Sequence, residues 1–213
     1  MQHEPWIWAV LAALGAFHGI NPAMGWLFAV ALGLQRGNRA AVTWALWPIA
    51  LGHALSIIAV VAVVGALRIV VEIVWLQIAG ALLLFAAAAY RLFGRHTARV
   101  GMQVGFRDLT VWSFVMATGH GAGVMLIPVL LRLPAGSAHA GHLHSAVLQG
   151  VSTAVAAVVV HTAAMLVSAG LVALIVYEWL GLAFLRRGWI NFDLLWVAAL
   201  TVAGLVLAVS ALL

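Results

Sequence analysis

The chain has 213 residues, of which 66% are hydrophobic and only 7% are charged. A water-soluble domain carries roughly a quarter charged residues, so the composition excludes water as the main solvent of this protein. The net charge of +5 comes from arginines that lie between apolar runs, which argues against a nucleic-acid surface. The absence of cysteine excludes disulfides and thiolate metal sites.

A helix that crosses a hydrocarbon core about 30 Å thick needs roughly 20 mostly apolar residues. Long apolar runs separated by Arg, Gly and Pro follow one another along the chain. They predict six transmembrane helices at 6–33, 41–66, 70–92, 109–131, 146–177 and 190–212. The expected fold is an all-α integral membrane protein, a single domain over 1–213 in contact with the lipid bilayer.

The arginines between the runs predict the orientation. Most of them fall in alternate connections: Arg36, Arg39, Arg91, Arg95, Arg99, Arg107, Arg186 and Arg187. The other side receives only Arg68 and Arg132. Under the positive-inside rule the arginine-rich side is cytoplasmic, so both termini should be periplasmic in a multi-pass protein of the bacterial inner membrane.

The two halves of the chain, 1–95 and 105–213, repeat one pattern. In each half a His-Gly pair precedes a methionine and the next span carries one histidine: His18, Gly19, Met24 and His53, then His120, Gly121, Met125 and His161. Because each half has three spans, the second enters the membrane from the opposite side. This pattern predicts two inverted three-helix repeats, as in many secondary transporters.

Gly and Pro predict a helix break in the first and fourth spans. Pro22 cannot supply a helical N–H, and it pushes Asn21 away from helical geometry. The stretch 119–123 is similarly rich in glycine. Breaks at this depth free backbone groups to face a cavity, so Gly19, Asn21, Pro22 and Gly121 are candidate substrate-binding residues. The alternative is that the glycines are close-packing faces.

Four histidines lie at similar depth in the predicted spans: His18, His53, His120 and His161. Ionisable residues in the membrane usually face the bundle interior and mark functional sites. Imidazole together with the thioethers of Met24 and Met125 suits late transition metals, although both methionines could be packing residues. No carboxylate lies mid-span, which favours a soft monovalent ion or a scheme in which histidine carries protons.

A histidine tract lies in the predicted outer loop, at His139, His142 and His144. Short histidine tracts can collect transition metals at the mouth of a pore. A polar loop without a metal role explains the tract equally well.

Several stretches resemble the lysine exporter (LysE) superfamily of membrane transporters. The segments 21–40, 49–53 and 77–93 look like its first three helices, so the resemblance covers about the first 95 residues. Within the superfamily, His18-Gly-Ile-Asn-Pro-Ala-Met24 is similar to the His-x-x-Glu-Pro-Gly-His element of the NicO group of nickel and cobalt exporters. By that resemblance His18 matches the first metal ligand, while Asn21 and Met24 replace the acid and the second histidine. The Gly-Pro-Gly-Pro pattern of the amino-acid exporters is missing.

These features favour a small secondary transporter that moves a transition-metal cation such as Ni, Co or Cu as substrate, with no permanently bound cofactor. A homodimer is compatible with the sequence. The alternatives are a proton-coupled exporter of an amino acid or other small organic solute, a b-type haem protein with bis-histidine ligation, and a packing subunit of a larger complex. No pattern typical of an enzyme active site or a nucleotide-binding loop is present, so no enzymatic activity is expected.

Overall fold

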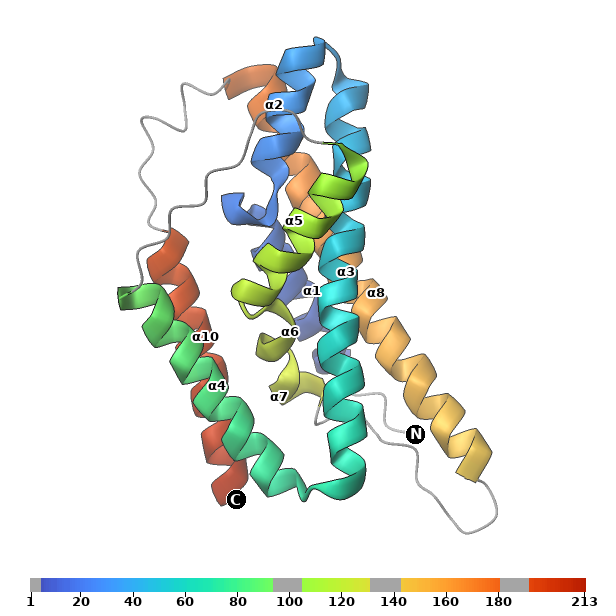
Figure 1. The fold of residues 1–213 in the computed structure, drawn as a ribbon, viewed down its shortest axis with the longest axis vertical. Helices are drawn as coiled ribbons and strands as arrows, with labels where there is room; N and C mark the ends of the chain where they lie inside the picture. Colours follow the sequence, from blue (N-terminus) through green and yellow to red (C-terminus); the bar gives the residue numbers. More distant parts are fainter. Residues whose placement is uncertain (1–4, 94–104, 131–142, 181–191) are drawn as a thin grey trace.

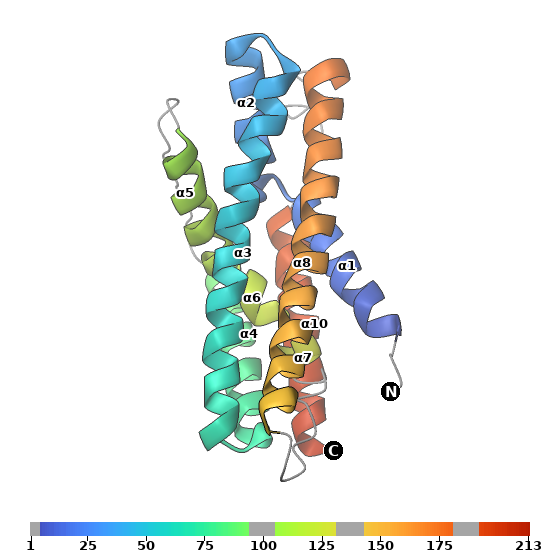
Figure 2. The same cartoon turned by 90° about the vertical axis from the view of Figure 1, so that its right-hand side faces the viewer.

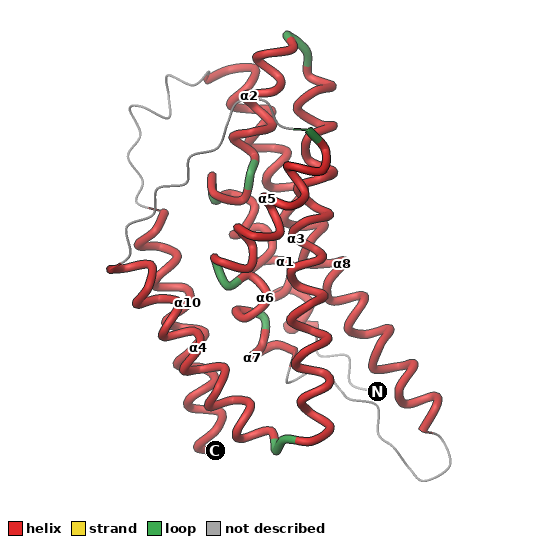
Figure 3. Tube along the Cα trace, viewed as in Figure 1, coloured by secondary structure: helices red, strands yellow, loops and turns green. Residues whose placement is uncertain are grey.

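The computed structural model describes residues 5–93, 105–130, 143–180 and 192–213, and these are helical apart from short turns (Figures 1 and 3). The first half begins with two helices separated by a short 3₁₀ turn. A long helix then runs back along the bundle, and a fourth helix runs in the opposite direction from the end of the third (Figure 1). In chain order these elements are α1 (Pro5–Ile20), η1 (Pro22–Met24), α2 (Trp26–Arg36), α3 (Arg39–Val70) and α4 (Ile73–Phe93).

The second half has a similar order of short, long and returning helices. Its first helix is followed by two single-turn helices, and its long helix ends in a π-helical turn. The elements are α5 (Phe106–Gly119), α6 (Ala122–Met125), α7 (Ile127–Leu130), α8 (Leu143–Ile175), η2 (Val176–Leu180) and α10 (Phe192–Leu212). The all-helical prediction is therefore confirmed for the described residues.

Three helical stretches are long and apolar enough to cross a membrane, at 39–67, 73–93 and 150–179. The bent pair formed by 106–119 and 122–129 makes a fourth if it is counted as one span. Large apolar side chains on these helices point outward, including Trp47 at 66% exposure and Leu82 at 64%. Such a continuous apolar exterior fits lipid and not water, so the helices indicate a multi-pass membrane protein.

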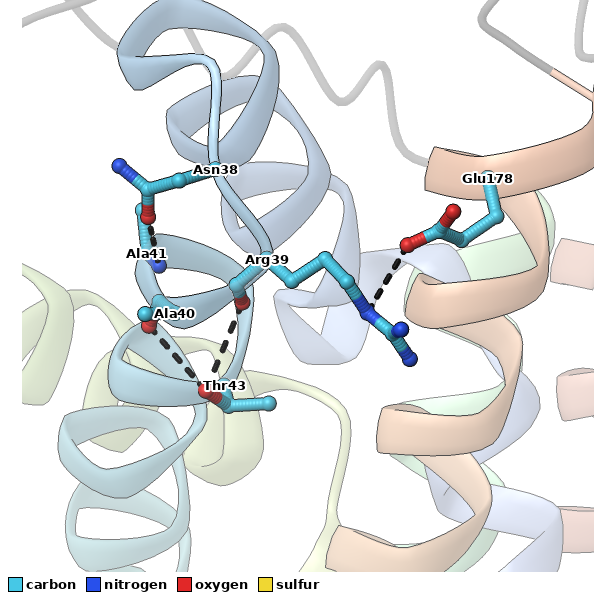
Figure 4. A network of polar contacts seen from close by, with 6 residues as sticks. All are labelled: Asn38, Arg39, Ala40, Ala41, Thr43 and Glu178. Carbon is cyan, nitrogen blue, oxygen red and sulfur yellow. Dashed lines mark hydrogen bonds and ion pairs between the residues drawn. The ribbon is translucent and has the colours of Figure 1, made fainter.

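The polar end of the bundle is formed by the α2–α3 turn. Asn38 caps α3 there, since its side-chain oxygen accepts a hydrogen bond from the backbone N–H of Ala41 at 2.8 Å. The side chain of Arg39 pairs with Glu178 in η2, with 2.9 Å between Nε and Oε1 (Figure 4). The start of α5 lies toward the same end, opposite to the α3–α4 turn (Figures 1 and 2). Arg36, Arg39 and Arg107 therefore lie toward one end of the bundle, while the side of the membrane that this end faces stays a prediction.

Helix pairing crosses between the two halves of the chain. Helix α1 packs against α8, α3 packs against α5 and also α8, and α4 packs against α10. Three apolar clusters hold these contacts. One joins α2, α3 and α8 around Trp26 and Met165, one joins α4 and α10 around Leu84 and Leu207, and one joins α1, α3 and α8 around Leu11.

Candidate functional site

The first helix break lies between α1 and α2. Asn21 adopts an extended backbone with φ −66° and ψ 124°, and its side-chain oxygen accepts a hydrogen bond from Ala23 N at 3.0 Å. Gly25 then turns the chain with φ +108°, a value that favours glycine. The indole N–H of Trp26 donates to the carbonyl of Ile20 at 3.0 Å, so it satisfies an acceptor at the end of α1. The predicted break in the first span is confirmed, but it spans 21–25 and not 18–22, because α1 continues to Ile20.

The second break lies between α5 and α6. Helix α5 ends at Gly119, and Gly121 has φ +73° before α6 begins at Ala122. The helix axes on either side of this break differ by 48°. The break predicted at 119–123 is therefore confirmed, and it depends on a glycine at 121 because a Cβ is strained at that backbone angle.

All four predicted histidines are buried, with exposures of at most 1%. Three of their rings meet where α1, α3 and α8 come together. The ring centroid of His18 lies 5.0 Å from that of His161 and 5.5 Å from that of His53. The ring centroids of His53 and His161 are 5.5 Å apart. His120, which caps the end of α5, is the fourth buried histidine. We call His18, His53, His120 and His161 the histidine cluster.

Backbone carbonyls orient three members of the histidine cluster. The distances from Nδ1 to carbonyl oxygen are 2.8 Å for His18 to Leu14, 2.7 Å for His120 to Met116 and 3.1 Å for His161 to Leu11. A carbonyl can only accept, so Nδ1 must carry the proton in each ring. In the neutral ring Nε2 is then the nitrogen with the lone pair, which is the arrangement found in metal-binding histidines.

His53 is held differently. Among the described residues neither of its ring nitrogens has a hydrogen-bond partner, and the same is true of Nε2 of His161. A buried polar atom without a partner costs about 1–3 kcal/mol. Groups of this kind in a folded protein require an explanation, and a ligand or ion bound during function is one.

Glycines permit the close helix packing that surrounds the histidine cluster. A Cβ added to Gly15 would overlap the carbonyl oxygen of His161, and one added to Gly19 would overlap Met165 O and Ser168 Oγ. On α3, a Cβ at Gly52 would overlap the carbonyl of Thr110. The close-packing interpretation therefore applies to Gly19, which lies against the α8 backbone.

Four hydroxyl side chains that the sequence patterns did not single out lie at the same helix contacts. Ser113 donates to the carbonyl of Ile49 at 2.7 Å, and Ser168 donates to that of Ala16 at 3.0 Å. The hydroxyls of Ser56 and Thr118 are 2.9 Å apart, and Thr118 donates to Phe114 O, so Ser56 is the donor in that pair. In the sequence, the only pattern that could have identified these hydroxyl residues is a small polar residue at helical spacing from a histidine or a glycine.

The remaining predicted site residues differ in their surroundings. Met24 and Asn21 are buried at the first break, with exposures of 3% and 6%. Met125 is equally buried, at 4%, but it packs in the apolar cluster of α4 and α10. His139 and His142 lie outside the described residues, and of His144 the structure describes only the backbone, in the first turn of α8.

The histidine cluster is not a formed metal site as it stands. In the part of the chain that the structure describes, no three His, Asp or Glu side chains are arranged to hold a metal ion. The His53 and His161 rings are stacked with planes 7° apart, so at least one ring must turn before the lone pairs can converge. Comparison of the chain with family models, with curated proteins and with solved structures finds no match.

Proposed function

We propose that this protein is a small secondary transporter of the bacterial inner membrane that moves a transition-metal cation. The observation that carries the proposal is the contact among the buried rings of His18, His53 and His161, with centroids 5.0–5.5 Å apart. Imidazole is a common ligand for Zn, Cu, Fe and Ni. Inside a membrane, buried ionisable side chains that gather at one point usually mark a substrate or ion pathway.

An inverted repeat would place this site between two halves that can rock against each other. The pairing of α1 with α8 and of α3 with α5 is reciprocal, since the first helix of each half packs on the long helix of the other. Side chain to backbone hydrogen bonds join each pair, from His161 to Leu11 O and from Ser113 to Ile49 O. Each helix of the first half runs opposite to its counterpart in the second half: α1 opposite to α5, α3 opposite to α8, and α4 opposite to α10 (Figures 1 and 2). These features support two three-helix units of opposite orientation.

The two helix breaks supply the movable parts. His18 lies in the last turn of α1 and His120 caps the end of α5, so each histidine sits directly before a break. A change in backbone conformation at either break would move the ring of His18 or of His120 relative to His53 and His161. The latter two residues lie in the long helices α3 and α8. We infer that alternating access opens the histidine cluster first to one side and then to the other.

The test is metal flux into liposomes that contain the purified protein, with His18→Ala and His120→Ala compared with wild type. Both substitutions should abolish flux while the protein elutes as a single folded species. Thr201→Ala is the control, because the Thr201 hydroxyl donates to Val197 O within α10 and Thr201 lies outside the histidine cluster. Unchanged flux in His18→Ala and His120→Ala would remove the assignment.

A second candidate is a proton-coupled exporter of a small organic solute. It is favoured by the absence, among described residues, of three side chains arranged as metal ligands, and by the stacking of the His53 and His161 rings. Neighbouring imidazoles can pass protons as well as bind metals. This function predicts solute transport that follows a pH gradient and is indifferent to a metal chelator. Metal-dependent flux lost on chelation would decide for the first candidate.

A further inference from the structure

The surroundings of the histidine cluster carry no acidic group in the described part of the chain. The buried polar side chains are His, Asn and Ser: His18, Asn21, His53, Ser56, Ser113, His120 and His161. The acidic residues whose side chains are described, Glu72, Asp108 and Glu178, are exposed at or beside helix ends. A cation in the histidine cluster would therefore be bound by neutral donors alone.

Neutral donors favour a cation of low charge. The free energy needed to move an ion from water into a medium of low dielectric constant rises with the square of its charge, so a divalent ion costs roughly four times as much as a monovalent ion of the same size. Many sites for divalent ions offset part of this cost with carboxylates or thiolates, and the chain contains no cysteine. A monovalent ion that binds neutral nitrogen and sulfur avoids the need for such compensation.

Met24 adds a soft sulfur donor at the first break. It is 3% exposed, yet it belongs to none of the three apolar clusters, which include Met125 and Met165. Two successive backbone hydrogen bonds link the Met24 backbone to the His18 backbone, since Asn21 N donates to His18 O at 3.1 Å and Met24 N donates to Asn21 O at 2.9 Å. Thioethers select soft ions such as Cu(I).

His53 is the ring that can turn to complete such a site. His18 and His161 hold their Nδ1 atoms against carbonyls, whereas the nitrogens of His53 have no partner among described residues. Rotation of the His53 ring therefore breaks no hydrogen bond that the structure describes. A bound ion would give its lone pair the partner it lacks.

Building on the proposed transport function, we propose that the substrate is a soft monovalent cation of the Cu(I) and Ag(I) class. Its ligands are ring nitrogens of His18, His53 and His161 and the thioether of Met24. This assignment distinguishes Met24 from Met125, although the sequence repeat makes the two equivalent.

The test uses Ag(I), which keeps its oxidation state during the assay, as the probe. Wild-type protein in liposomes is given Ag(I), Zn, Ni or Co separately, and accumulated metal is measured by mass spectrometry. Ag(I) should accumulate at least about tenfold faster than any divalent ion. Histidine-dependent transport of a divalent ion without Ag(I) transport would overturn the monovalent assignment and leave the proposed function standing. Failure of all four metals would overturn both.

The thioether is tested with two matched variants. Met24→Leu should weaken Ag(I) binding roughly tenfold or more, as the loss of a metal-site group commonly does. Met125→Leu should bind as wild type, because Met125 packs among apolar side chains and leucine has a similar volume. Equal Ag(I) binding by the two variants would exclude Met24 as a ligand, whichever metals the wild-type protein transports in liposomes.

Discussion

The rings of His53 and His161 lie stacked with their planes 7° apart and their centroids separated by 5.5 Å. The two residues come from the middle of α3 and α8, the long helices of the two halves, and neither is exposed by more than 1%. Their contact joins the halves at the bundle centre. It differs from ordinary core packing because His53 has no hydrogen-bond partner for either nitrogen among the described residues.

Replacing His53 with leucine should separate function from stability. The variant loses no hydrogen bond that the structure describes, so we expect its unfolding free energy to equal or exceed that of wild type, while metal or solute transport is lost. His161→Leu removes the bond to Leu11 O and should lower stability by about 1 kcal/mol. Thermal unfolding in detergent, followed by size-exclusion chromatography, measures the difference. A lower melting temperature for His53→Leu than for His161→Leu would contradict this account.

Gly19→Ala should destabilise the packing of α1 on α8. The added methyl would overlap Met165 O and Ser168 Oγ, and overpacking of this kind costs about 1–3 kcal/mol. Gly65→Ala in α3 is the matched control, because open space surrounds its Cβ position and alanine favours a helix by up to about 1 kcal/mol. Thermal melts of the two variants should move in opposite directions, and a loss of equal size in both would argue against close packing at Gly19.

Gly121→Ala should disturb the second helix break. An alanine at φ +73° costs about 1–2 kcal/mol, and the chain can relieve that strain by extending α5 through the break. Because His120 directly precedes Gly121, we expect transport to fall with the change. An added Cβ at Gly119 meets no atom within 4 Å, so the Gly119→Ala variant should transport its substrate at the wild-type rate. Flux measured in liposomes compares the two, and normal flux in Gly121→Ala would show that the break is not needed.

The absence of native cysteine allows a direct test of sidedness. Single cysteines at Gln35 and at Glu72 occupy exposed positions at opposite ends of the bundle. The positive-inside rule predicts that a membrane-impermeant thiol reagent labels Gln35→Cys only from the cytoplasm and Glu72→Cys only from outside. Labelling of both from one side would exclude the proposed topology.

The ion pair between Arg39 and Glu178 should contribute little to stability. It lies at the polar end of the bundle, with the two side chains 68% and 34% exposed, and such pairs are worth about 0–1 kcal/mol. Arg39→Gln should therefore melt within a few degrees of wild type, and the small difference should shrink as salt is added. A large, salt-independent loss would mean that the pair locks α3 to η2.

The sequence by itself determined the membrane class, the helical content and the positions of both breaks. These depend on local chemistry, namely the length of apolar runs and the backbone limits of Pro22 and Gly121. It also indicated that four histidines would be buried, because an ionisable residue in a lipid-crossing helix must face the protein interior.

Only the tertiary structure decided which of these side chains meet. Rotation of a helix about its axis depends on the helices packed against it, and here Gly15 and Gly19 set how closely α1 approaches α8. That packing brings His18 to His53 and His161 and gives the Nδ1 of His161 a carbonyl on another helix. The same packing gives Met24 and Met125 different surroundings, although the sequence repeat made them equivalent. The apolar neighbours of Met125 come from α4 and α10, which are distant from it in the chain.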